Sequence, residues 1–365
     1  MSSLTEGDVL NALRPIEDPD FGRSIVDLDF VKNLQIEGQR VSFSIELTTP
    51  ACPVKEKFKE AAHSAVLALD GVSEVDVTMT AHTRGSKHEG KPDGLARVHN
   101  VIAVASGKGG VGKSTVAVNL ALALAETGAQ VGLLDCDIYG PSIPLMLGVA
   151  GQPRVTPDKK IEPLESCGIV VMSIGFLVGE NSPVIWRGPM VHGVIRQFLG
   201  EVSWGELDYL VIDLPPGTGD AVLTVTQTAP LAGAVIVTTP QEVALIDARK
   251  GLQMFQTVQV PVLGIVENMS YFVCDGCGKR HVIFGEGGAA RAASELDTEL
   301  LVQVPLQPDV VSAGDEGKPT LLARPDSPVA AAMRELAGLI ARKLSVLNSE
   351  APAVLGANIE WVDSP

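Results

Sequence analysis

VIAVASGKGGVGKST, residues 101–115, joins a short apolar run to a glycine-rich loop and the start of a predicted helix that continues to about residue 126. The pattern G-x-x-x-x-G-K-[ST] is filled by Gly107, Gly112, Lys113 and Ser114. Glycines let consecutive backbone N–H groups surround phosphate oxygens, and the start of a helix adds its positive dipole end. The stretch therefore predicts a phosphate-binding loop between a strand and a helix. The alternative is a glycine-rich turn without a ligand.

Each residue of this loop has an expected role. Lys113 would neutralise the outer phosphates of a nucleotide, and the Ser114 hydroxyl would ligate Mg²⁺. Lys108 is an additional lysine inside the loop, in the pattern K-G-G-x-G-K-[ST]. Such a lysine can serve its own site or reach the phosphates bound by a neighbouring subunit, as an arginine finger does; a solvated surface lysine is the plain alternative. The expected nucleotide-binding residues here are Gly107, Lys108, Gly109, Gly110, Val111, Gly112, Lys113, Ser114 and Thr115.

Short apolar runs rich in β-branched residues recur on the C-terminal side of the loop, and predicted helices separate most of them. Near-continuous apolar strands that alternate with helices are typical of an α/β domain whose mostly parallel sheet is covered by helices on both faces. The predicted strands are residues 101–106, 131–135, 169–174, 209–213, 234–239, 262–268 and 300–304.

Carboxylates end two of these predicted strands. Asp135 and Asp137 close the run at 131–135, and Asp213 closes the run at 209–213, just before LPPGTGD. The carboxyl ends of parallel strands form the ligand-binding edge of such a sheet. We expect Asp135 to support Mg²⁺ through a water, Asp137 to orient the attacking water, and Asp213 to act as a Walker B aspartate before a switch loop. The Gly217 N–H would meet the γ-phosphate; for each aspartate the alternative is a helix cap.

Cys274 and Cys277 lie in YFVCDGCGKRHVIFGEGG, residues 271–288, where glycines allow a tight loop. Thiolates at this spacing ligate zinc or the iron of Fe–S clusters. One pair supplies two ligands, whereas zinc and cubane clusters usually take four. Two subunits with one pair each, bridging one cluster, would complete the set, which agrees with the dimer suggested by Lys108.

Other interpretations of this cysteine pair stay open at this point. They are a zinc knuckle, a thioredoxin-like redox pair and two inert cysteines. His281 is a candidate third ligand or a surface histidine.

The whole chain divides into four predicted parts. Residues 1–80 form a small α+β domain with helices at 6–13 and 53–69 and strands at 30–37, 39–47 and 72–80. Residues 81–97 are polar and aperiodic and predict a linker. The nucleotide-binding domain with its C-x-x-C loop covers 98–348, and 349–365 form a tail.

Composition excludes several functional classes. The formal net charge is −16 and aromatic residues are 4% of 365, which disfavours binding to nucleic acid or an anionic membrane surface. No apolar run approaches the ~20 residues of a transmembrane helix, and the N-terminus does not resemble a secretory signal. The five cysteines do not form a disulfide pattern. We therefore expect a cytoplasmic protein.

The lysine pattern resembles the deviant Walker A ATPases, which include MinD, ParA and the nitrogenase iron protein. Residues 98–347 closely resemble one branch, the Mrp/ApbC family of iron–sulfur cluster carrier ATPases. The matching motifs are ASGKGGVGKST, LLDCDIYGPSIP, VIWRGPM, VIDLPPGTGD, V-x-N-M-S before C-x-x-C, and IFGEGG after it. Residues 1–80 resemble the cluster-assembly domain often fused to such carriers, through EDPDFGRSIVDLDFV and ELTTPACPVKE.

The resemblance implies a homodimeric ATPase that holds a labile cluster, with 4Fe–4S favoured, and passes it from upstream scaffolds to apo-proteins. It implies that Lys108 crosses a nucleotide-sandwich dimer and that Asn268 contacts adenine, which favours ATP over GTP. Cys136 stands where the family usually has alanine, and we expect it to pack in the interior. Cys52 precedes a predicted helix, where it would serve in cluster handoff or in packing.

A MinD/ParA-type positioning switch with a zinc or vestigial cysteine pair is the main alternative function. It would bind DNA or membrane, and the acidic charge, the cysteines and the weakly basic helix at 328–347 argue against it. A third possibility is a metal-bound scaffold with an inert ATP site.

Overall fold

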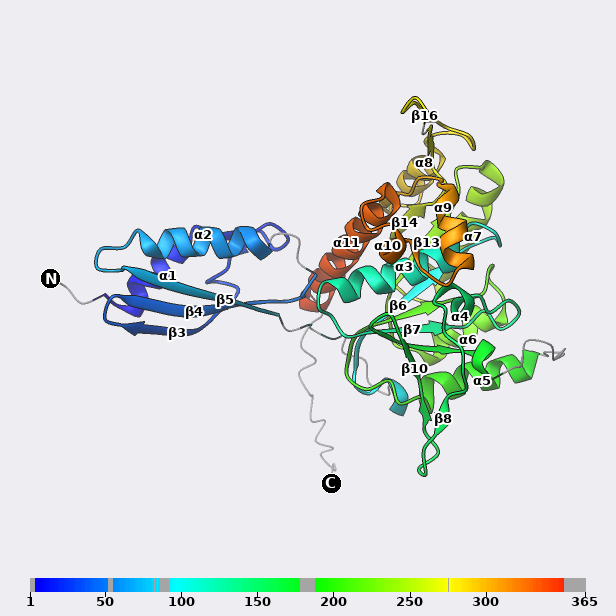
Figure 1. The fold of residues 1–365 in the computed structure, drawn as a ribbon, viewed down its shortest axis with the longest axis horizontal. Helices are drawn as coiled ribbons and strands as arrows, with labels where there is room; N and C mark the ends of the chain where they lie inside the picture. Colours follow the sequence, from blue (N-terminus) through cyan, green and yellow to red (C-terminus); the bar gives the residue numbers. More distant parts are fainter. Residues whose placement is uncertain are drawn as a thin grey trace, which may run out of the picture.

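The computed structural model describes residues 4–51, 55–81, 83, 85, 92–177, 188–274 and 276–350. Figure 1 shows a small N-terminal body joined to a larger one that carries the long sheet. Each body has its own cluster of buried apolar side chains. No helix among the described residues is long and apolar enough to cross a membrane.

The N-terminal body is a three-stranded sheet with a helix along it (Figure 1). Its central strand alternates inward apolar side chains, so that Val41, Phe43, Ile45 and Leu47 are buried. That strand pairs antiparallel with β3 and parallel with β5. The elements are α1 (Glu6–Leu13), β1 (Glu17–Asp18), β2 (Arg23–Ser24), β3 (Val31–Glu37), β4 (Arg40–Leu47), α2 (Lys55–Leu67) and β5 (Glu74–Ala81).

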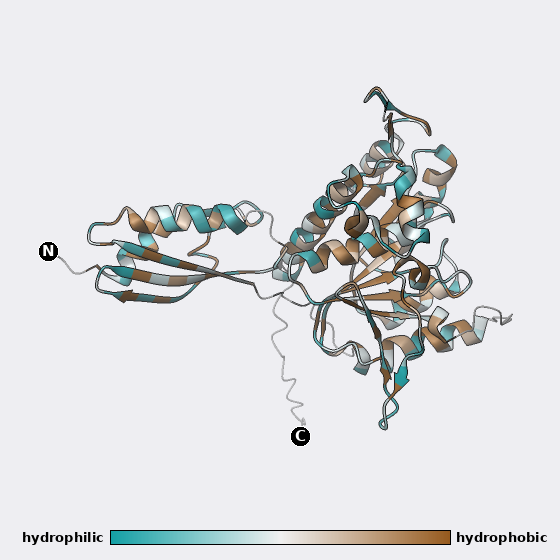
Figure 2. Ribbon diagram, in the orientation of Figure 1, coloured by the Kyte–Doolittle hydropathy of each residue, from teal (hydrophilic) through white to brown (hydrophobic). Residues whose placement is uncertain are grey.

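The larger body is built on an eight-stranded sheet of order β10-β11-β7-β12-β6-β13-β14-β17. Every neighbouring pair is parallel except β10 with β11. The strands are apolar along their length (Figure 2), as expected of a sheet buried on both faces. They are β6 (Val98–Ala105), β7 (Val131–Asp135), β10 (Leu164–Ser166), β11 (Ile169–Ser173), β12 (Leu207–Asp213), β13 (Leu231–Thr238), β14 (Val262–Glu267) and β17 (Leu300–Gln303).

Helices cover this sheet, which confirms the predicted fold class. The helix after the phosphate loop is buried almost throughout, because it packs against both the sheet and the last long helix. The helices are α3 (Lys113–Glu126), α4 (Ile143–Met146), α5 (Gly188–Gly200), α6 (Asp220–Thr228), α7 (Glu242–Thr257), α8 (Gly288–Glu295), α9 (Pro308–Asp315), α10 (Thr320–Ala323) and α11 (Pro328–Glu350). Short pieces are η1 (Asp93–Leu95), η2 (Ile174–Phe176), β8 (Arg154–Val155), β9 (Ile161–Glu162), β15 (Phe272–Val273) and β16 (Arg280–His281).

The two bodies meet at the amino-terminal edge of the large sheet. The hydroxyls of Thr49 and Tyr209 lie 2.8 Å apart, and Tyr209 is near the start of β12. Ser345 of α11 donates a hydrogen bond of 2.5 Å to Thr48. Asp213 ends the same β12 strand, so the N-terminal body docks at the edge opposite the phosphate loop.

The interval predicted as a linker is packed at its C-terminal end. Leu95 is fully buried, and η1 contacts α5. Thr83 is also buried, and β5 extends through Ala81. The chain therefore folds onto the large body several residues before β6 begins. The predicted tail begins inside α11, and residues 351–365 lie outside the described residues.

Candidate nucleotide site and cysteine hairpin

Close contacts require glycine in the loop between β6 and α3. Gly110 and Gly112 have φ of 80° and 81°, in the left-handed region that favours glycine. A Cβ at Gly107 would lie 2.2 Å from the backbone of Asp247, and one at Gly112 would lie 2.1 Å from Asn268 Nδ2. The loop is therefore pressed against α7 on one side and the end of β14 on the other.

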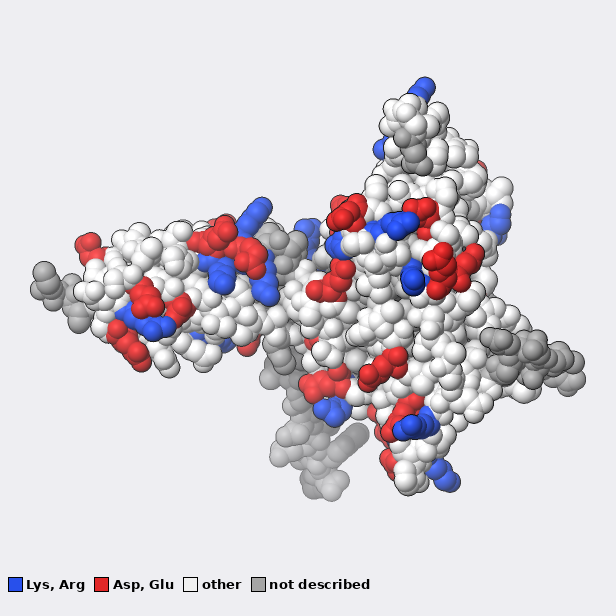
Figure 3. Space-filling model, in the orientation of Figure 1, with Lys and Arg blue, Asp and Glu red and all other residues white. Residues whose placement is uncertain are grey.

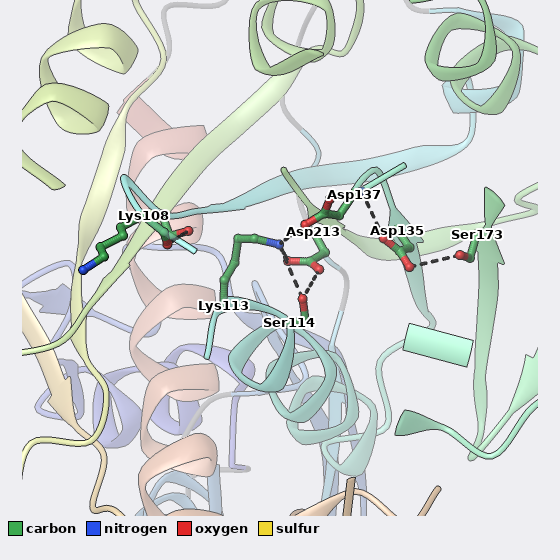
Figure 4. A network of polar contacts seen from close by, with 8 residues as sticks. Lys108, Lys113, Ser114, Asp135, Asp137, Ser173 and Asp213 are labelled. Atoms are coloured by element: carbon green, nitrogen blue, oxygen red, sulfur yellow. Dashed lines mark hydrogen bonds and ion pairs between the residues drawn. The ribbon is translucent and has the colours of Figure 1, made fainter. Parts of the chain in front are cut away.

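A polar network begins at the first residue of α3. Lys113, which is buried, donates from Nζ to Asp213 Oδ1 at 2.6 Å, and Ser114 Oγ donates to Asp213 Oδ2 at 2.6 Å (Figure 4). Asp137 Oδ2 lies 3.9 Å from Lys113 Nζ. The structure thus brings four of the predicted site residues into one cluster.

Strand register explains why the carboxylates meet. β12 lies between β6 and β7, and Asp213 is directly opposite Asp135. Asp135 accepts hydrogen bonds from Ser173 Oγ at 3.0 Å and from the Asp137 N–H at 3.0 Å. Neither Asp135 nor Asp213 is exposed to solvent. Two carboxyl groups are therefore buried side by side at the end of the sheet.

Burial raises the pKa values of the aspartates in this cluster. Burial, reinforced by the charge of Asp213, raises the pKa of Asp135 to about 8. Burial also raises the pKa of Asp213 and of Asp137, and in both cases the Lys113 ammonium opposes the rise. Clustered carboxylate and hydroxyl oxygens are the donors that Mg²⁺ prefers, so these residues fit that ion.

Lys108 is exposed, and its side chain points away from this cluster (Figure 4). Its backbone carbonyl accepts a hydrogen bond from Ser106 Oγ at 3.0 Å, which fixes the loop beneath it. The role of Lys108 toward a nucleotide bound by a second subunit stays a prediction.

Two predicted residues contact the loop from neighbouring strand ends. The Gly217 N–H donates to the Ser106 carbonyl at 2.8 Å, so the segment after β12 is tied to the phosphate loop. Asn268 Nδ2 donates to the Val111 carbonyl at 2.9 Å. The contact of Asn268 with adenine stays a prediction. A cleft of about 350 Å³ lies alongside, with Asp137 and Pro216 in its lining.

The cysteine pair lies in a hairpin that projects from the larger body next to α8 (Figure 1). Phe272 and Val273 of β15 pair with His281 and Arg280 of β16. The Cys274 N–H donates to the Lys279 carbonyl at 3.0 Å. Hydrogen bonding and strand pairing thus fix the base of the loop that carries both sulfurs.

The turn is tight. The Gly278 N–H donates to the Cys274 carbonyl at 2.7 Å, and Gly278 has a φ of 69°. Cys274 is half-buried and Cys277 is exposed. No three His, Cys, Asp or Glu side chains come together as a metal site anywhere in the described ranges. His281 is exposed, with its ring centroid 6.5 Å from that of Phe272.

Cys52, for which cluster handoff or packing is predicted, lies outside the described residues, as do Trp186 and Arg187 of the VIWRGPM motif. Cys136 is buried, in agreement with a packing role, and burial raises the pKa of its thiol.

Two polar residues of the region were missed by the sequence reasoning. Ser173 ends β11 and holds Asp135, and Glu267 ends β14 directly before Asn268. The signal available in the sequence is a polar residue that closes a buried apolar strand, as Ser173 and Glu267 both do.

Comparison with known proteins agrees with this architecture. A family model described as "NUBPL iron-transfer P-loop NTPase" matches residues 97–341, and one described as "Iron-sulfur cluster assembly protein" matches residues 6–77. The "Iron-sulfur cluster carrier protein" of Synechocystis sp. is 51% identical over 348 residues, which cover 94% of this chain and 99% of that protein.

Solved structures show the same fold. A nucleotide-binding protein from Archaeoglobus fulgidus, in complex with ADP, is 45% identical with a TM-score of 0.57, covering 65% of this chain and 92% of that one. The cell division ATPase MinD of Pyrococcus furiosus is 24% identical with a TM-score of 0.51, covering 66% and 98%, and this likeness concerns the fold alone. From the family match and the extent of the likeness to its relatives, the chain belongs to the NUBPL-type iron-transfer P-loop NTPases, as its motifs predicted.

Proposed function

We propose that this protein is a cytoplasmic, homodimeric iron–sulfur cluster carrier that hydrolyses ATP. It holds a labile 4Fe–4S cluster between the cysteine pairs of two subunits, receives it from upstream scaffolds and passes it to apo-proteins. The observation that carries the proposal is the presence, in one chain of this family, of the Lys113–Ser114–Asp213 network and a projecting two-cysteine hairpin.

ATP hydrolysis at this site consists of positioning and charge neutralisation. Lys113 neutralises the outer phosphates, and Asp137 orients the water that attacks the γ-phosphate. Ser114 and, through a water, Asp135 would hold Mg²⁺, which neutralises phosphate charge when bound. Lys108 is exposed and serves the partner subunit's nucleotide. The Gly217 N–H leaves the Ser106 carbonyl, to which it donates in this structure, and meets the γ-phosphate; Asn268 contacts adenine.

Cluster binding uses the hairpin. One chain offers Cys274 and Cys277, so four thiolates require two chains. Cys277 is exposed, and ligands at an exposed tip let an acceptor approach the cluster. Few and accessible ligands therefore suit a cargo that has to be released.

A positioning switch that acts on DNA or membrane is less consistent with the surface. On the face drawn in Figure 3, Lys and Arg side chains are interspersed with Asp and Glu rather than gathered into a basic field. The net charge of −16 works against phosphate-rich partners.

Anaerobic reconstitution with iron and sulfide tests the cargo site. Wild type should gain broad visible absorption at about four irons per dimer. Cys274→Ala and Cys277→Ala should each lose it. Cys167→Ser is the matched control, because Cys167 is exposed at the β10–β11 turn, away from the hairpin. Variants that hold as much iron as wild type would contradict the proposal.

A further inference from the structure

Glu267 is a buried carboxylate at the end of β14 that none of the roles above uses. It is 1% exposed, and its Oε1 accepts hydrogen bonds from Ser270 Oγ at 2.6 Å and from Gln303 Nε2 at 2.7 Å. Its Oε2 accepts from the Ala289 N–H at 3.1 Å. Within the described ranges no cationic side chain forms an ion pair with it. Burying a charge without an opposite charge is costly, so such a carboxylate depends on these donors.

These donors lie at the two ends of the cysteine hairpin. Ser270 directly precedes the segment 271–287, and Ala289 is in the first turn of α8, which directly follows it. A carboxylate is also favoured at a helix start by the dipole. One side chain therefore anchors both ends of the segment that carries the cysteines.

Asn268, which directly follows Glu267, faces the phosphate loop. Asn268 donates to the Val111 carbonyl, and its amide nitrogen would lie 2.1 Å from a Cβ at Gly112. So close a contact leaves little room to absorb a displacement of the loop. Glu267 and Asn268 thus connect the two sites through adjacent residues of one strand end.

The backbone at this connection is unusual. Met269, between Asn268 and Ser270, has a φ of 54°, a left-handed conformation that is strained for a residue with a side chain. Neighbouring contacts hold it there: the Asn268 N–H donates to Thr238 and the Ser270 N–H donates to Val304. A strained residue between two fixed ones is a place where a small shift can change the conformation.

We propose that Glu267 is a positioning residue that transmits the nucleotide state of the phosphate loop to the cysteine hairpin and so regulates cluster release. This regulation rests on the proposed carrier function. A nucleotide that displaces the loop moves Asn268, and Glu267 carries the movement to both ends of segment 271–287.

Glu267→Gln is the sharpest test, because it keeps the side chain's shape. The amide carries one oxygen, so its NH₂ group must face a donor, either the Ala289 N–H or Ser270 and Gln303. Glu299→Gln is the matched control, since Glu299 is an exposed carboxylate just before the neighbouring strand β17. Ser270→Ala is a milder second variant that removes a single donor and leaves the carboxylate in place.

Two measurements on the full-length protein decide the proposal. In the first, amide hydrogen exchange of residues 271–287 is compared with Mg²⁺ and a non-hydrolysable ATP analogue, with ADP, and without nucleotide. Wild type and Glu299→Gln should change their exchange with nucleotide, Ser270→Ala should change less, and Glu267→Gln should not change. An unresponsive hairpin in wild type, or a wild-type response in Glu267→Gln, overturns the proposal.

In the second measurement, an iron chelator removes the cluster from loaded protein with and without the analogue. Coupling of ordinary size would change the wild-type release rate by about 5- to 150-fold, and Glu267→Gln should reduce the change to about 2-fold or less while still loading iron and binding nucleotide. A wild type that binds no cluster would refute the carrier function, while the exchange experiment would still decide the coupling.

Discussion

Lys108 and Lys113, five residues apart in the same loop, illustrate how the placement of a side chain separates the roles of two lysines. Lys113 is buried against Asp213, whereas Lys108 is exposed and points away. Lys113→Ala leaves a buried carboxylate without its cation, so we expect the free energy of unfolding to fall by about 3 kcal/mol and ATP binding to be lost. Urea unfolding and nucleotide titration measure both effects.

Lys108→Ala should behave differently. An exposed side chain contributes little to folding, so stability should stay within about 0.5 kcal/mol of wild type and ATP should still bind. If the lysine serves the partner's phosphates, hydrolysis should slow by at least ~10-fold, well within what a finger residue can supply. Phosphate release at the wild-type rate would refute the role across the dimer.

Asp135 makes a pH-dependent contribution that can be tested without nucleotide or Mg²⁺. Burial, reinforced by Asp213, raises its pKa from 3.8 to about 8. Between these values the folded state binds a proton that the unfolded state has released, so this group lowers stability as pH rises. Asp135→Asn removes the effect. Its free energy of unfolding should therefore fall less than that of wild type between about pH 5 and about pH 8, as measured by urea titration at each pH.

The packing of the phosphate loop on α7 distinguishes two glycines of that loop, Gly107 and Gly109. A Cβ at Gly107 would meet the Asp247 backbone at 2.2 Å, whereas one at Gly109 would meet only Pro216 Cγ, at 4.0 Å. Backbone cannot move aside as a side chain can, so Gly107→Ala should cost about 3 kcal/mol. Gly109→Ala should change the free energy of unfolding by less than about 0.5 kcal/mol. Equal chemical unfolding midpoints for the two variants would show that the loop is not pressed against α7.

Most elements of the larger body could be predicted, because their signals are local. A buried parallel strand is a short apolar run, and the phosphate loop is a contiguous motif, so residues such as Asp213 could be assigned a place at the sheet edge. β10 (Leu164–Ser166) was not predicted, since three residues antiparallel to β11 give no periodic signal. The role of Glu267 depends on Gln303 and Ala289, distant in sequence, and no local pattern reveals such contacts.

The junction between the two bodies depends on contacts that no sequence pattern reveals. Thr49 and Tyr209 are 160 residues apart, yet their hydroxyls form a buried hydrogen bond. Burial raises the pKa of Tyr209 to about 12, so the phenol is neutral at ordinary pH. Tyr209→Phe and Thr49→Val should each cost about 1 kcal/mol, and a double-mutant cycle should show a coupling of at least about 0.5 kcal/mol. Additive effects in urea unfolding would contradict this junction.

A cluster that bridges two subunits predicts how much iron binds when wild-type and cysteine-free subunits are mixed. If one cluster bridges two subunits, a dimer with one intact pair offers two thiolates, too few to hold it. Wild-type apo-protein is mixed with the Cys274→Ala/Cys277→Ala double variant, allowed to exchange subunits and then reconstituted. In an equal mixture, random pairing leaves about one quarter of the dimers intact, so iron content should fall to about one quarter of the wild-type value.

A site complete within each subunit predicts a different dependence on the mixing ratio. Iron would then fall in proportion to the wild-type fraction, to about one half in the equal mixture, whereas a bridging site gives the square of that fraction. Mixtures with Cys167→Ser serve as the control, because that variant keeps both hairpin cysteines and should bind full iron at every ratio. A linear dependence would refute the bridging site and leave the cysteine pair as a ligand set completed within its own chain. The squared dependence would require both hairpins at one cluster, and so a dimer in which the two projecting tips face each other.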